Sequence, residues 1–438
     1  NTLLFIYNVY FHPLSNVPGP KHLILSSIVK VYYQFRGTLQ LNINRWHNLY
    51  GPVIRLGVNE ISVIDQYYST EIYCNQNYKK SKLMELLGVM FGKNLFTIRD
   101  RVEHINRKKM VCEAFNRRSL IRMEAVIWED GVKELLNKLE NNTEEGQIVN
   151  LASEFHNLTF DVIGKLIFGQ HFNLLANHSH QLIDNFNNFN IMLIMLTTFP
   201  FLRYIRVPFL SKFYNAIDYK NDFAKKAVKL KKLSNSREED IMDHYLEARD
   251  PETDTKLTDK ELQDETMILL FSGVDTTAST ISMCIYHLLK YPNVYFNVLE
   301  ELDRVKPVDE VTGKIRSFSW LKENIPYLGA VIYETIRLYP AFAFGVPRLV
   351  PEGGATAAGY YLPSDTEVSV SIFSYQRSAQ YFENPDEFIP SRWLRNSKDE
   401  LKHSIIAFGR GSTTCIGKQL ALIQITLTLV GLLTRFEL

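Results

Sequence analysis

The most regular hydrophobic pattern in the chain is a long apolar stretch from Leu262 to Lys290. Thr258 and Glu261 precede it with the three-residue spacing of a capping box, and Pro292 follows its end. The pattern predicts a helix of about 32 residues, roughly 48 Å long. Because such a helix must cross the whole molecule, we expect the other elements to pack around it.

Shorter apolar patterns predict further elements on both sides of this helix. Apolar positions at helical spacing follow Gly417, and two prolines bracket another helix over residues 326–340. Residues 52–64 have the pattern of a β-hairpin, and residues 366–372 alternate with the period of a strand. The chain is therefore expected to combine many helices with a few short strands.

Three other stretches have a distinctive composition. Residues 83–96 are rich in Met, Leu, Phe and Gly, which predicts a loop too apolar to be a mere solvated connector. Residues 186–213 are aromatic and apolar but are broken by Pro200 and Pro208, so they predict two helices and a loop. A run of lysines predicts a solvated helix face; it comprises Lys225, Lys226, Lys229, Lys231 and Lys232.

Length, net charge and cysteine usage limit the number of domains, the kinds of partner and the cellular compartment that we expect. The 438 residues suggest two to four domains from length alone. A net charge of +1 gives no electrostatic reason to expect a nucleic-acid partner. The cysteines are scattered singly, at Cys74, Cys112, Cys284 and Cys415, which fits a reducing compartment better than a disulfide framework.

The segment around Cys415 carries the first candidate chemistry. It reads FGRGSTTCIG, so small residues precede the cysteine, which lies where a glycine-rich loop meets a helix N-terminus. That position should lower the pKa of the thiol, because the helix dipole and free N–H groups favour an anion. The alternative is a buried structural cysteine. Zinc fits poorly because it needs about four protein ligands, whereas haem supplies four nitrogens of its own.

The same segment resembles the haem-binding loop of the cytochrome P-450 family, F-G-x-G-x-R-x-C-x-G. The matching residues are Phe408, Gly409, Gly411, Cys415 and Gly417, and the family's usual arginine is Thr413 here. The resemblance implies haem b (iron protoporphyrin IX), with Cys415 as the metal ligand and Phe408, Gly409 and Gly417 in the cofactor site. The loss of the arginine implies a haem that is bound less tightly.

The resemblance extends over nearly the whole chain and implies the cytochrome P-450 fold. That fold is mainly α with small β-sheets and holds the haem between a long central helix and the cysteine loop. Residues 18–438 would form this one domain, and the chain contains no linker or internal repeat that opposes this. The family usually continues into a C-terminal β-hairpin, which the chain is expected to lack.

The middle of the long helix reads SGVDTT from Ser272 to Thr277, a poor choice for a buried helix centre. It resembles the family motif [A/G]-G-x-[D/E]-T-T. Gly273 would allow a flat cofactor to approach, and the Thr276 hydroxyl would bond back to the preceding turn and open a groove for O2. Asp275 and Thr276 are the expected catalytic residues, which relay protons with water. The alternative is a polar kink between packed helices.

Other matches concern the haem propionates and the loop beneath the haem. His104 and Lys108 share one helix face and could point together at an anion. In the family the corresponding residues contact a propionate, as does the strand arginine matched by Arg348. Glu334 and Arg337 match E-x-x-R, and Arg392 lies in the matching F-x-P-x-R-W segment. These last three would form a structural triad: Glu334, Arg337 and Arg392.

The N-terminal region resembles that of microsomal members, particularly fungal ones. Residues 1–17 are expected to be the end of a membrane anchor and its hinge, and the rigid Pro18-Gly19-Pro20 follows; an ordinary N-terminal loop is the alternative. The resemblance places the protein in the endoplasmic reticulum membrane with its catalytic domain facing the cytoplasm. It also makes residues 83–96 a pocket roof and residues 186–213 a cover for the substrate entrance that touches the bilayer; core packing is the alternative for both.

The implied function is haem-thiolate monooxygenation of an apolar small molecule with O2, in fungal secondary metabolism. Electrons would come from NADPH through a separate NADPH-cytochrome reductase, because the chain has no flavin or nicotinamide fingerprint. Basic residues such as Arg107 and Lys109 could serve as docking points for that partner. Two alternatives stay open: a non-catalytic or degenerate haem-binding member, and a haem isomerase or dehydratase that needs no reductase.

Overall fold

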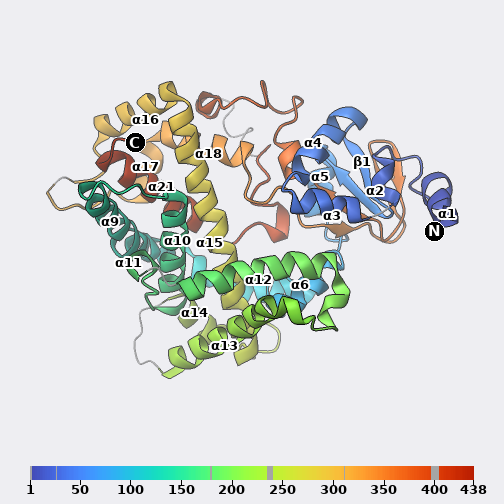
Figure 1. The fold of residues 1–438 in the computed structure, drawn as a ribbon, viewed down its shortest axis with the longest axis horizontal. Helices are drawn as coiled ribbons and strands as arrows, with labels where there is room; N and C mark the ends of the chain where they lie inside the picture. Colours follow the sequence, from blue (N-terminus) through green and yellow to red (C-terminus); the bar gives the residue numbers. More distant parts are fainter. Residues whose placement is uncertain (1, 26, 178–179, 234–239, 310, 396–403) are drawn as a thin grey trace.

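The computed structural model describes residues 2–25, 27–177, 180–233, 240–309, 311–395 and 404–438. Figure 1 shows that most helices gather around α15, whereas the strands and the first helices lie together on the other side. The fold is therefore mainly α with small β-sheets, as predicted.

Helix α15 (Asp259–Lys290) is the predicted long helix, and its start and end follow the expected signals. The Thr258 side chain accepts from the Glu261 N–H, and the Glu261 side chain accepts from the Thr258 N–H, which completes the capping box. Pro292 does more than end α15, because it is also the first residue of α16 (Pro292–Val305). The prediction of a single long rod is confirmed.

The main core surrounds α15, which packs against α10 (Leu151–Phe168), α13 (Ser211–Leu233), α18 (Pro326–Leu338) and α21 (Lys418–Arg435). Gly273 lies in the contact with α10. A Cβ atom there would lie 3.0 Å from Ile163 Cδ1, so glycine lets these two helices approach closely. The contact that shows the need for glycine is the one with α10, and room for a flat cofactor beside Gly273 stays a prediction.

The larger sheet has the strand order β1-β2-β6-β3. β1 (Val53–Gly57) and β2 (Glu60–Val63) form the predicted hairpin, and β6 (Glu367–Val370) is the predicted strand, parallel to β2. β3 (Arg348–Leu349) pairs antiparallel with β6, which carries Arg348 to the edge of the sheet. The smaller sheet pairs β4 (Ala355–Ala357) with β5 (Tyr360–Leu362).

The remaining described elements are short helices and turns. The helices are α1 (Thr2–Ile6), α2 (Lys21–Leu25), α3 (Ser27–Phe35), α4 (Leu39–Tyr50), α5 (Gln66–Cys74), α6 (Leu83–Phe91), α7 (Arg101–Cys112), α8 (Arg117–Val126), α9 (Lys133–Glu144), α11 (Leu174–Asn177), α12 (His180–Thr198), α14 (Ile241–Glu247), α17 (Phe318–Asn324) and α19 (Ile372–Tyr375). The 3-10 and π segments are η1 (Tyr7–Phe11), η2 (Glu113–Phe115), η3 (Ile127–Val132), η4 (Pro200–Arg203), η5 (Pro208–Leu210), η6 (Pro390–Leu394) and η7 (Gly411–Thr413).

Residues 83–91 correct a prediction, because they form helix α6 and not a loop. The segment is dominated by Leu, Met and Glu, which all have high helix propensity. Gly92 ends the helix with a φ of 73°, a conformation that favours glycine. Phe91 packs edge-on against Phe189 of α12, so α6 and α12 share one aromatic contact.

The predicted helix pair is present as α12 and α13, with η4 and η5 starting at the two prolines between them. The lysine run needs a correction. Lys231 is buried, and its ammonium group bonds to Asp240 at 2.6 Å and to Asp243 at 2.8 Å. Because α14 begins beside this part of α13, Lys231 serves as a buried ion-pair partner and not as part of a solvated face.

The segment after the N-terminal helices is anchored to β1 by Arg55. This buried guanidinium group donates to the carbonyl oxygens of Asn8 at 2.9 Å and Leu14 at 3.4 Å. Gly19 packs on the Arg55 backbone so closely that an added Cβ would lie 2.3 Å from the Arg55 carbonyl oxygen. The Pro18-Gly19-Pro20 connector therefore lies directly against the larger sheet.

Candidate functional site

The loop before Cys415 has a backbone shape that depends on its glycines. Gly409 and Gly411 have φ angles of 72° and 66°, which other residues rarely adopt. A Cβ atom on Gly411 would also lie 2.6 Å from the Tyr73 carbonyl oxygen, so the loop lies against the end of α5. The Cys415 N–H then bonds to the Phe408 carbonyl oxygen at 2.8 Å, which closes the loop around the cysteine.

The Cys415 sulfur lies at the start of α21, as predicted, with Gly417 as the helix N-cap. The side chain is accessible to solvent, yet protein atoms surround it closely. Desolvation raises the pKa of the thiol, although backbone N–H groups of Gly417 and Lys418 and the Lys418 charge act in the opposite direction. The expected net lowering of the pKa was wrong, because the cost of burial outweighs the helix N-terminus.

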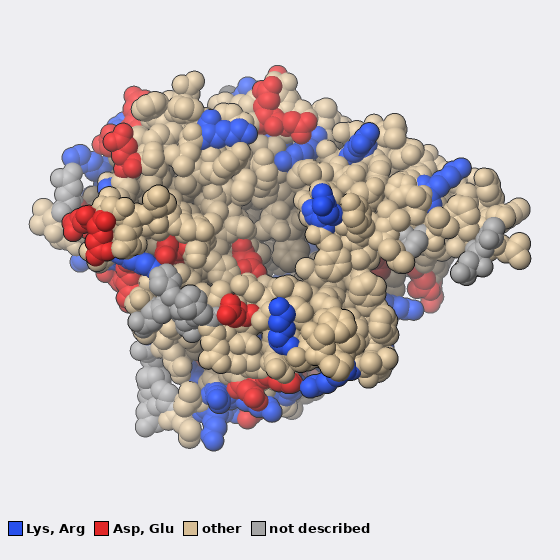
Figure 2. Space-filling view, viewed as in Figure 1, with Lys and Arg blue, Asp and Glu red and all other residues tan. Residues whose placement is uncertain are grey.

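The middle of α15 carries a stripe of hydroxyl groups along one helix face, where Ser272 and Ser279 are exposed. The side chains of Ser272, Thr276 and Ser279 donate to carbonyl oxygens four residues earlier, at 2.7, 2.6 and 2.7 Å. Thr276 thus makes the back-bond that its β-branched hydroxyl predicts. Figure 2 shows that this face is hollowed beside the middle of α15, between the helices and the sheet region.

Asp275 is held by two side chains that sequence reasoning missed. Its Oδ1 lies 2.7 Å from His156 Nε2 of α10, and its Oδ2 accepts from Asn190 Nδ2 of α12 at 3.1 Å. The partners lie 119 and 85 residues away in the chain. Neither belongs to a local motif, so only the packing of three helices reveals the arrangement.

The residues expected at the propionates converge on the loop before Cys415. Arg348 Nη2 donates to Thr413 Oγ1 at 2.7 Å, and Lys108 Nζ donates to the Ser412 carbonyl oxygen at 2.7 Å. His104 is buried beside them. Burial, together with the charges of Lys80, Lys108 and Arg348, lowers the pKa of His104 to about 3, so its imidazole is neutral at physiological pH. The structure brings all three residues to one place.

Lys80 joins this basic cluster, although no sequence pattern singled it out. It is buried in the segment before α6, and its Nζ donates to the carbonyl oxygens of Leu95 at 3.1 Å and Phe96 at 2.7 Å. Desolvation, followed by the nearby charge of Arg348, lowers its pKa to about 7. Only its position in the fold marks it, because a lone lysine in a loop carries no signal.

The cluster of Lys80, His104, Lys108 and Arg348 fits an anionic group. Within the described residues, the hydrogen bonds of the three cations go to carbonyl and hydroxyl oxygens and none goes to a carboxylate. Arg348 Nε is buried and has no partner among those same residues. Lys80 and Arg348 are buried, and a buried cation is costly unless it is paired and hydrogen-bonded. The two carboxylates of haem b would supply negative charge opposite the cluster and a hydrogen-bond acceptor for Arg348 Nε.

The three residues of the predicted triad meet in the interior. Arg337 Nε and Nη2 donate to the Glu334 carboxylate at 2.8 and 2.9 Å, and Arg392 Nε donates to it at 3.1 Å. Trp393 Nε1 adds a bond of 2.9 Å to the same carboxylate, a contact that the sequence did not predict. The cluster ties α18 to the η6 segment that precedes the cysteine loop.

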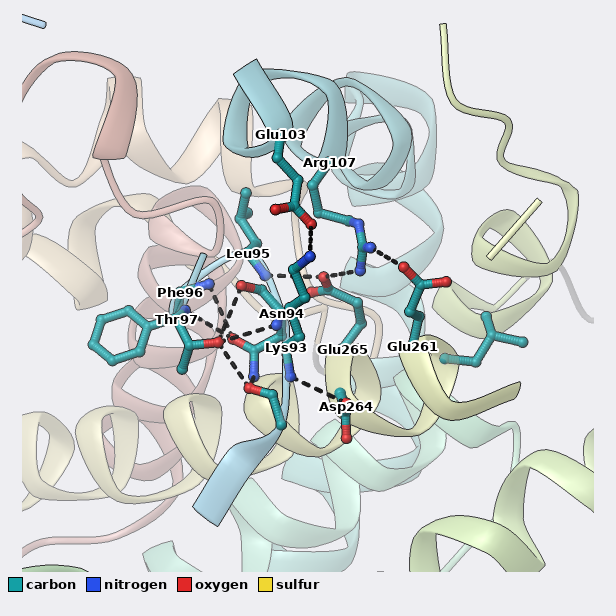
Figure 3. A network of polar contacts seen from close by, with 12 residues as sticks. Lys93, Asn94, Leu95, Phe96, Thr97, Glu103, Arg107, Glu261, Asp264 and Glu265 are labelled. Carbon is teal, nitrogen blue, oxygen red and sulfur yellow. Dashed lines mark hydrogen bonds and ion pairs between the residues drawn. The ribbon is translucent and has the colours of Figure 1, made fainter. Parts of the chain in front are cut away.

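Arg107 is a correction, because it is buried and not part of a solvated or partner-facing surface. Figure 3 shows its guanidinium group between two carboxylates of α15. It bonds to Glu265 Oε1 at 3.0 Å and pairs with Glu261. Glu265 also accepts from the Leu95 N–H at 2.9 Å. The network therefore fastens α7 and the segment after α6 to the first turns of α15.

We expect Glu265 to make the free energy of unfolding depend on pH. Burial raises its pKa to about 7, although the Arg107 charge opposes the shift. Between about pH 4.5 and 7 the folded chain holds a proton that the unfolded chain has released, so stability falls as pH rises, by up to about 3 kcal/mol. Glu265→Gln should flatten this part of the profile of urea unfolding against pH.

Glu261→Gln is the matched control, because hydrogen bonds from Thr258 and the Arg107 charge outweigh burial and lower the pKa of Glu261. That variant should keep the wild-type slope above pH 5. An unchanged slope in Glu265→Gln would show that another group takes up the proton.

Comparison with known proteins supplies the context for this geometry. The family model described as cytochrome P-450 matches residues 17–438. A cytochrome P-450 monooxygenase named astA, from Talaromyces wortmannii, is 30% identical over 451 aligned residues, which cover 100% of this chain and 88% of that protein. A trichothecene C-4 hydroxylase from Trichoderma arundinaceum is 28% identical, and the alignment covers 100% of this chain and 89% of that protein.

A solved structure supports the fold independently. The crystal structure of the cytochrome P-450DA heme domain superposes with a TM-score of 0.80 and 20% identity, covering 95% of this chain and 90% of that one. At this identity the likeness concerns the fold alone.

Proposed function

The chain belongs to the cytochrome P-450 family, and from that premise we propose that it is a haem-thiolate monooxygenase of fungal secondary metabolism. The relatives are named as monooxygenases, so the chain is an oxidoreductase. The observation that carries the proposal is Cys415, presented by a glycine-shaped loop at the start of α21. The proposed cofactor is haem b and the proposed metal ligand is the Cys415 thiolate.

The residues described above would hold the cofactor both at its iron and at its propionate groups. Cys415 would bind the iron, and Phe408, Gly409 and Gly417 would shape the loop around it. His104, Lys108 and Arg348, with Lys80, would meet the propionates. Haem b would supply the redox-active iron that monooxygenation needs, a reaction in which one atom of O2 enters the substrate and the other leaves as water.

The protein's own part in the reaction is to hold and move protons. Thr276 is fixed by its bond to the Ser272 carbonyl oxygen, which leaves its hydroxyl oxygen able to accept a hydrogen bond from water. Asp275, one residue earlier, would supply the proton. The Glu334, Arg337 and Arg392 cluster would keep the loop under the haem in place without taking part in the chemistry.

The substrate is proposed to be an apolar small molecule, and electrons are proposed to come from NADPH through a separate reductase. The aromatic side chains of Phe91, Phe186, Phe189 and Phe271 support an apolar pocket wall, because they pack together between α6, α12 and α15. The test uses the haem-loaded chain with a reductase, NADPH and a panel of apolar compounds. Compounds that bind should shift the Soret band, and one of them should yield an oxygenated product in step with NADPH consumption.

The same experiment distinguishes the monooxygenase from the two alternative functions. Conversion of a compound without NADPH would indicate a haem isomerase or dehydratase. Soret shifts with no product under either condition would indicate a haem-binding member without activity. Thr276 favours the monooxygenase, because an accessible threonine with a back-bonded hydroxyl serves oxygen chemistry that an isomerase does not need.

We also propose attachment to the endoplasmic reticulum membrane, with residues 1–17 as the end of an anchor and its hinge and residues 18–438 as the haem domain facing the cytoplasm. Apolar side chains between α12 and α13 support a bilayer contact: Phe201 is 56% and Phe209 81% exposed. Replacing both with serine should weaken binding to phospholipid vesicles by about 100-fold or more, because fully burying each aromatic side chain contributes about 1.5–3 kcal/mol. Phe296→Ser, a 65% exposed residue of α16, is the control; equal losses would contradict the contact.

Thr413 gives a prediction about how tightly haem is held. Thr413 stands where the family has an arginine, and its hydroxyl accepts from Arg348. Thr413→Arg should slow haem transfer to an excess of haem-free globin, because a charge-assisted bond to a propionate contributes about 1.5–3 kcal/mol. Thr414→Arg places the same charge one residue later and should not slow the transfer. Equal rates in Thr413→Arg and the parent would count against a propionate beside position 413.

A further inference from the structure

Three helices meet at the Asp275 carboxylate. His156 of α10 approaches Oδ1 at 2.7 Å, and Asn190 of α12 donates to Oδ2 at 3.1 Å. Because both carboxylate oxygens act as acceptors, the hydrogen in the first contact must lie on His156 Nε2. The Asp275 side chain is 47% exposed and the His156 side chain 22% exposed. The pair therefore lies between the protein interior and solvent.

The imidazole ring of His156 is held in this orientation by aromatic packing. Its centroid lies 5.8 Å from that of Phe186, edge-on, and 6.4 Å from that of Phe160. Phe186 in turn stacks on Phe271 of α15 at 4.4 Å, with the rings nearly parallel. One ring nitrogen thus faces Asp275, and Nδ1 has no partner within the part of the chain that the structure describes.

Asp275 and Thr276 do not contact each other directly. Adjacent helix residues point about 100° apart, and the Thr276 hydroxyl donates to Ser272. Asp275 can therefore receive a proton on the side that faces α10 and pass a proton on through water. Among the described residues, His156 is the titratable side chain bonded to this carboxylate.

We propose that His156 is the residue that reloads Asp275 with protons during turnover; this inference rests on the proposed monooxygenase function. Monooxygenation consumes two electrons and two protons for each O2, so the carboxylate must be reprotonated in every cycle. A proton passes from Nε2 to Oδ1 while Nδ1 takes one from a buffer acid in the solvent, whose conjugate base stays in solution. The ring then returns to its starting tautomer by exchange with solvent. Asn190 keeps the carboxylate in place during the transfer but carries no proton itself.

Two substitutions separate proton transfer from mere support. His156→Gln keeps a hydrogen-bond donor toward Asp275 but cannot relay a proton. Asn190→Leu removes the other hydrogen bond and leaves the imidazole. If His156 relays protons, His156→Gln should keep the melting temperature and the substrate-induced Soret shift. Its product yield per NADPH should nevertheless fall about tenfold or more, with peroxide released instead and a larger solvent isotope effect. Asn190→Leu should change the yield much less.

A measurement without turnover tests the contact itself. In ¹⁵N-histidine-labelled protein, the His156 resonances should show a hydrogen on Nε2, and Asp275→Ala should shift the Nε2 signal. Unchanged resonances in Asp275→Ala, or a full product yield in His156→Gln, would overturn the proposal. If the wild-type chain itself forms no product with NADPH, the proposed function fails; the NMR outcome still decides whether the His156–Asp275 contact exists.

Discussion

Replacing Cys415 with serine should remove the red-displaced Soret band of the reduced, carbon-monoxide-treated protein and reduce product formation by roughly 10³-fold or more. Serine keeps the size and the hydrogen-bonding geometry of the side chain, but its hydroxyl does not bind iron as a thiolate does. The loop itself should survive, because the Cys415 N–H bond to Phe408 and the conformations of Gly409 and Gly411 involve the backbone alone. The spectrum therefore reports the ligand and not the fold.

The other cysteines provide the control for this experiment. Cys112 is exposed at the end of α7 and its sulfur contacts the Lys109 carbonyl oxygen at 3.5 Å. Cys112→Ser should keep both the displaced band and the activity. A displaced band that persists in Cys415→Ser would mean that a different sulfur binds the iron, and the site described here would be wrong.

The parts of the fold that the sequence predicts well are those whose signals are local. The start of α15 follows from Thr258 and Glu261, and its end follows from Pro292, all within a few residues of the boundaries. The Cys415 loop follows from glycine spacing, because positive φ angles need glycine wherever the loop lies in the fold. Each of these signals depends only on neighbouring residues, so it can be recognised without knowing the tertiary packing.

The parts that sequence reasoning missed depend on partners far away in the chain. Arg107 looks like a surface cation until Glu261 and Glu265 are placed beside it, more than 150 residues later. Lys231 is similar, because its burial depends on how α14 packs. His156 and Lys80 belong to no motif. Charged residues are assigned to the surface by default, so buried pairs are the usual error.

Residues 83–91 show a second kind of error, and Gly273 shows a related limit of motifs. The apolar composition of residues 83–91 indicated burial but did not distinguish a helix from a loop, and nine residues are too few for a clear period. For Gly273, the motif identified a position that needs a small residue but not its contact with Ile163 of α10. A motif gives residue types; only the packing shows which contact each one serves.

Glu334→Gln should destabilise the chain by about 3–5 kcal/mol and prevent stable haem incorporation. The Glu334 side chain is fully buried. It accepts hydrogen bonds from the Arg337 and Arg392 guanidinium groups, the Trp393 indole and the Ile389 N–H. Glutamine removes the charge that balances the two buried cations and turns one acceptor into a donor that faces other donors. Urea unfolding and haem content measure the two effects.

The pH dependence of the same residue gives an independent check. Burial raises the pKa of Glu334, but the hydrogen bond and charge of Arg337 outweigh it and hold the pKa below the ordinary value. This stability is present above about pH 4.5 and is lost as pH falls through the folded-state pKa, because the unfolded chain takes up the proton first. Acid should therefore destabilise the wild type by protonating Glu334. The Glu334→Gln variant should not show this part of the acid destabilisation.

Glu323→Gln supplies the comparison, since Glu323 is an exposed carboxylate on α17, the helix before α18. A surface substitution of this kind changes stability by about 0.5 kcal/mol or less. The contrast between the two variants follows from burial and from the density of donors around Glu334, because the chemical change is identical. Unfolding curves that coincide for Glu334→Gln and Glu323→Gln would mean that the cluster does not hold the loop before Cys415. The loop would then have to be positioned by its other contacts, which include those of Lys108, Arg348 and Gln376, and by its own glycines.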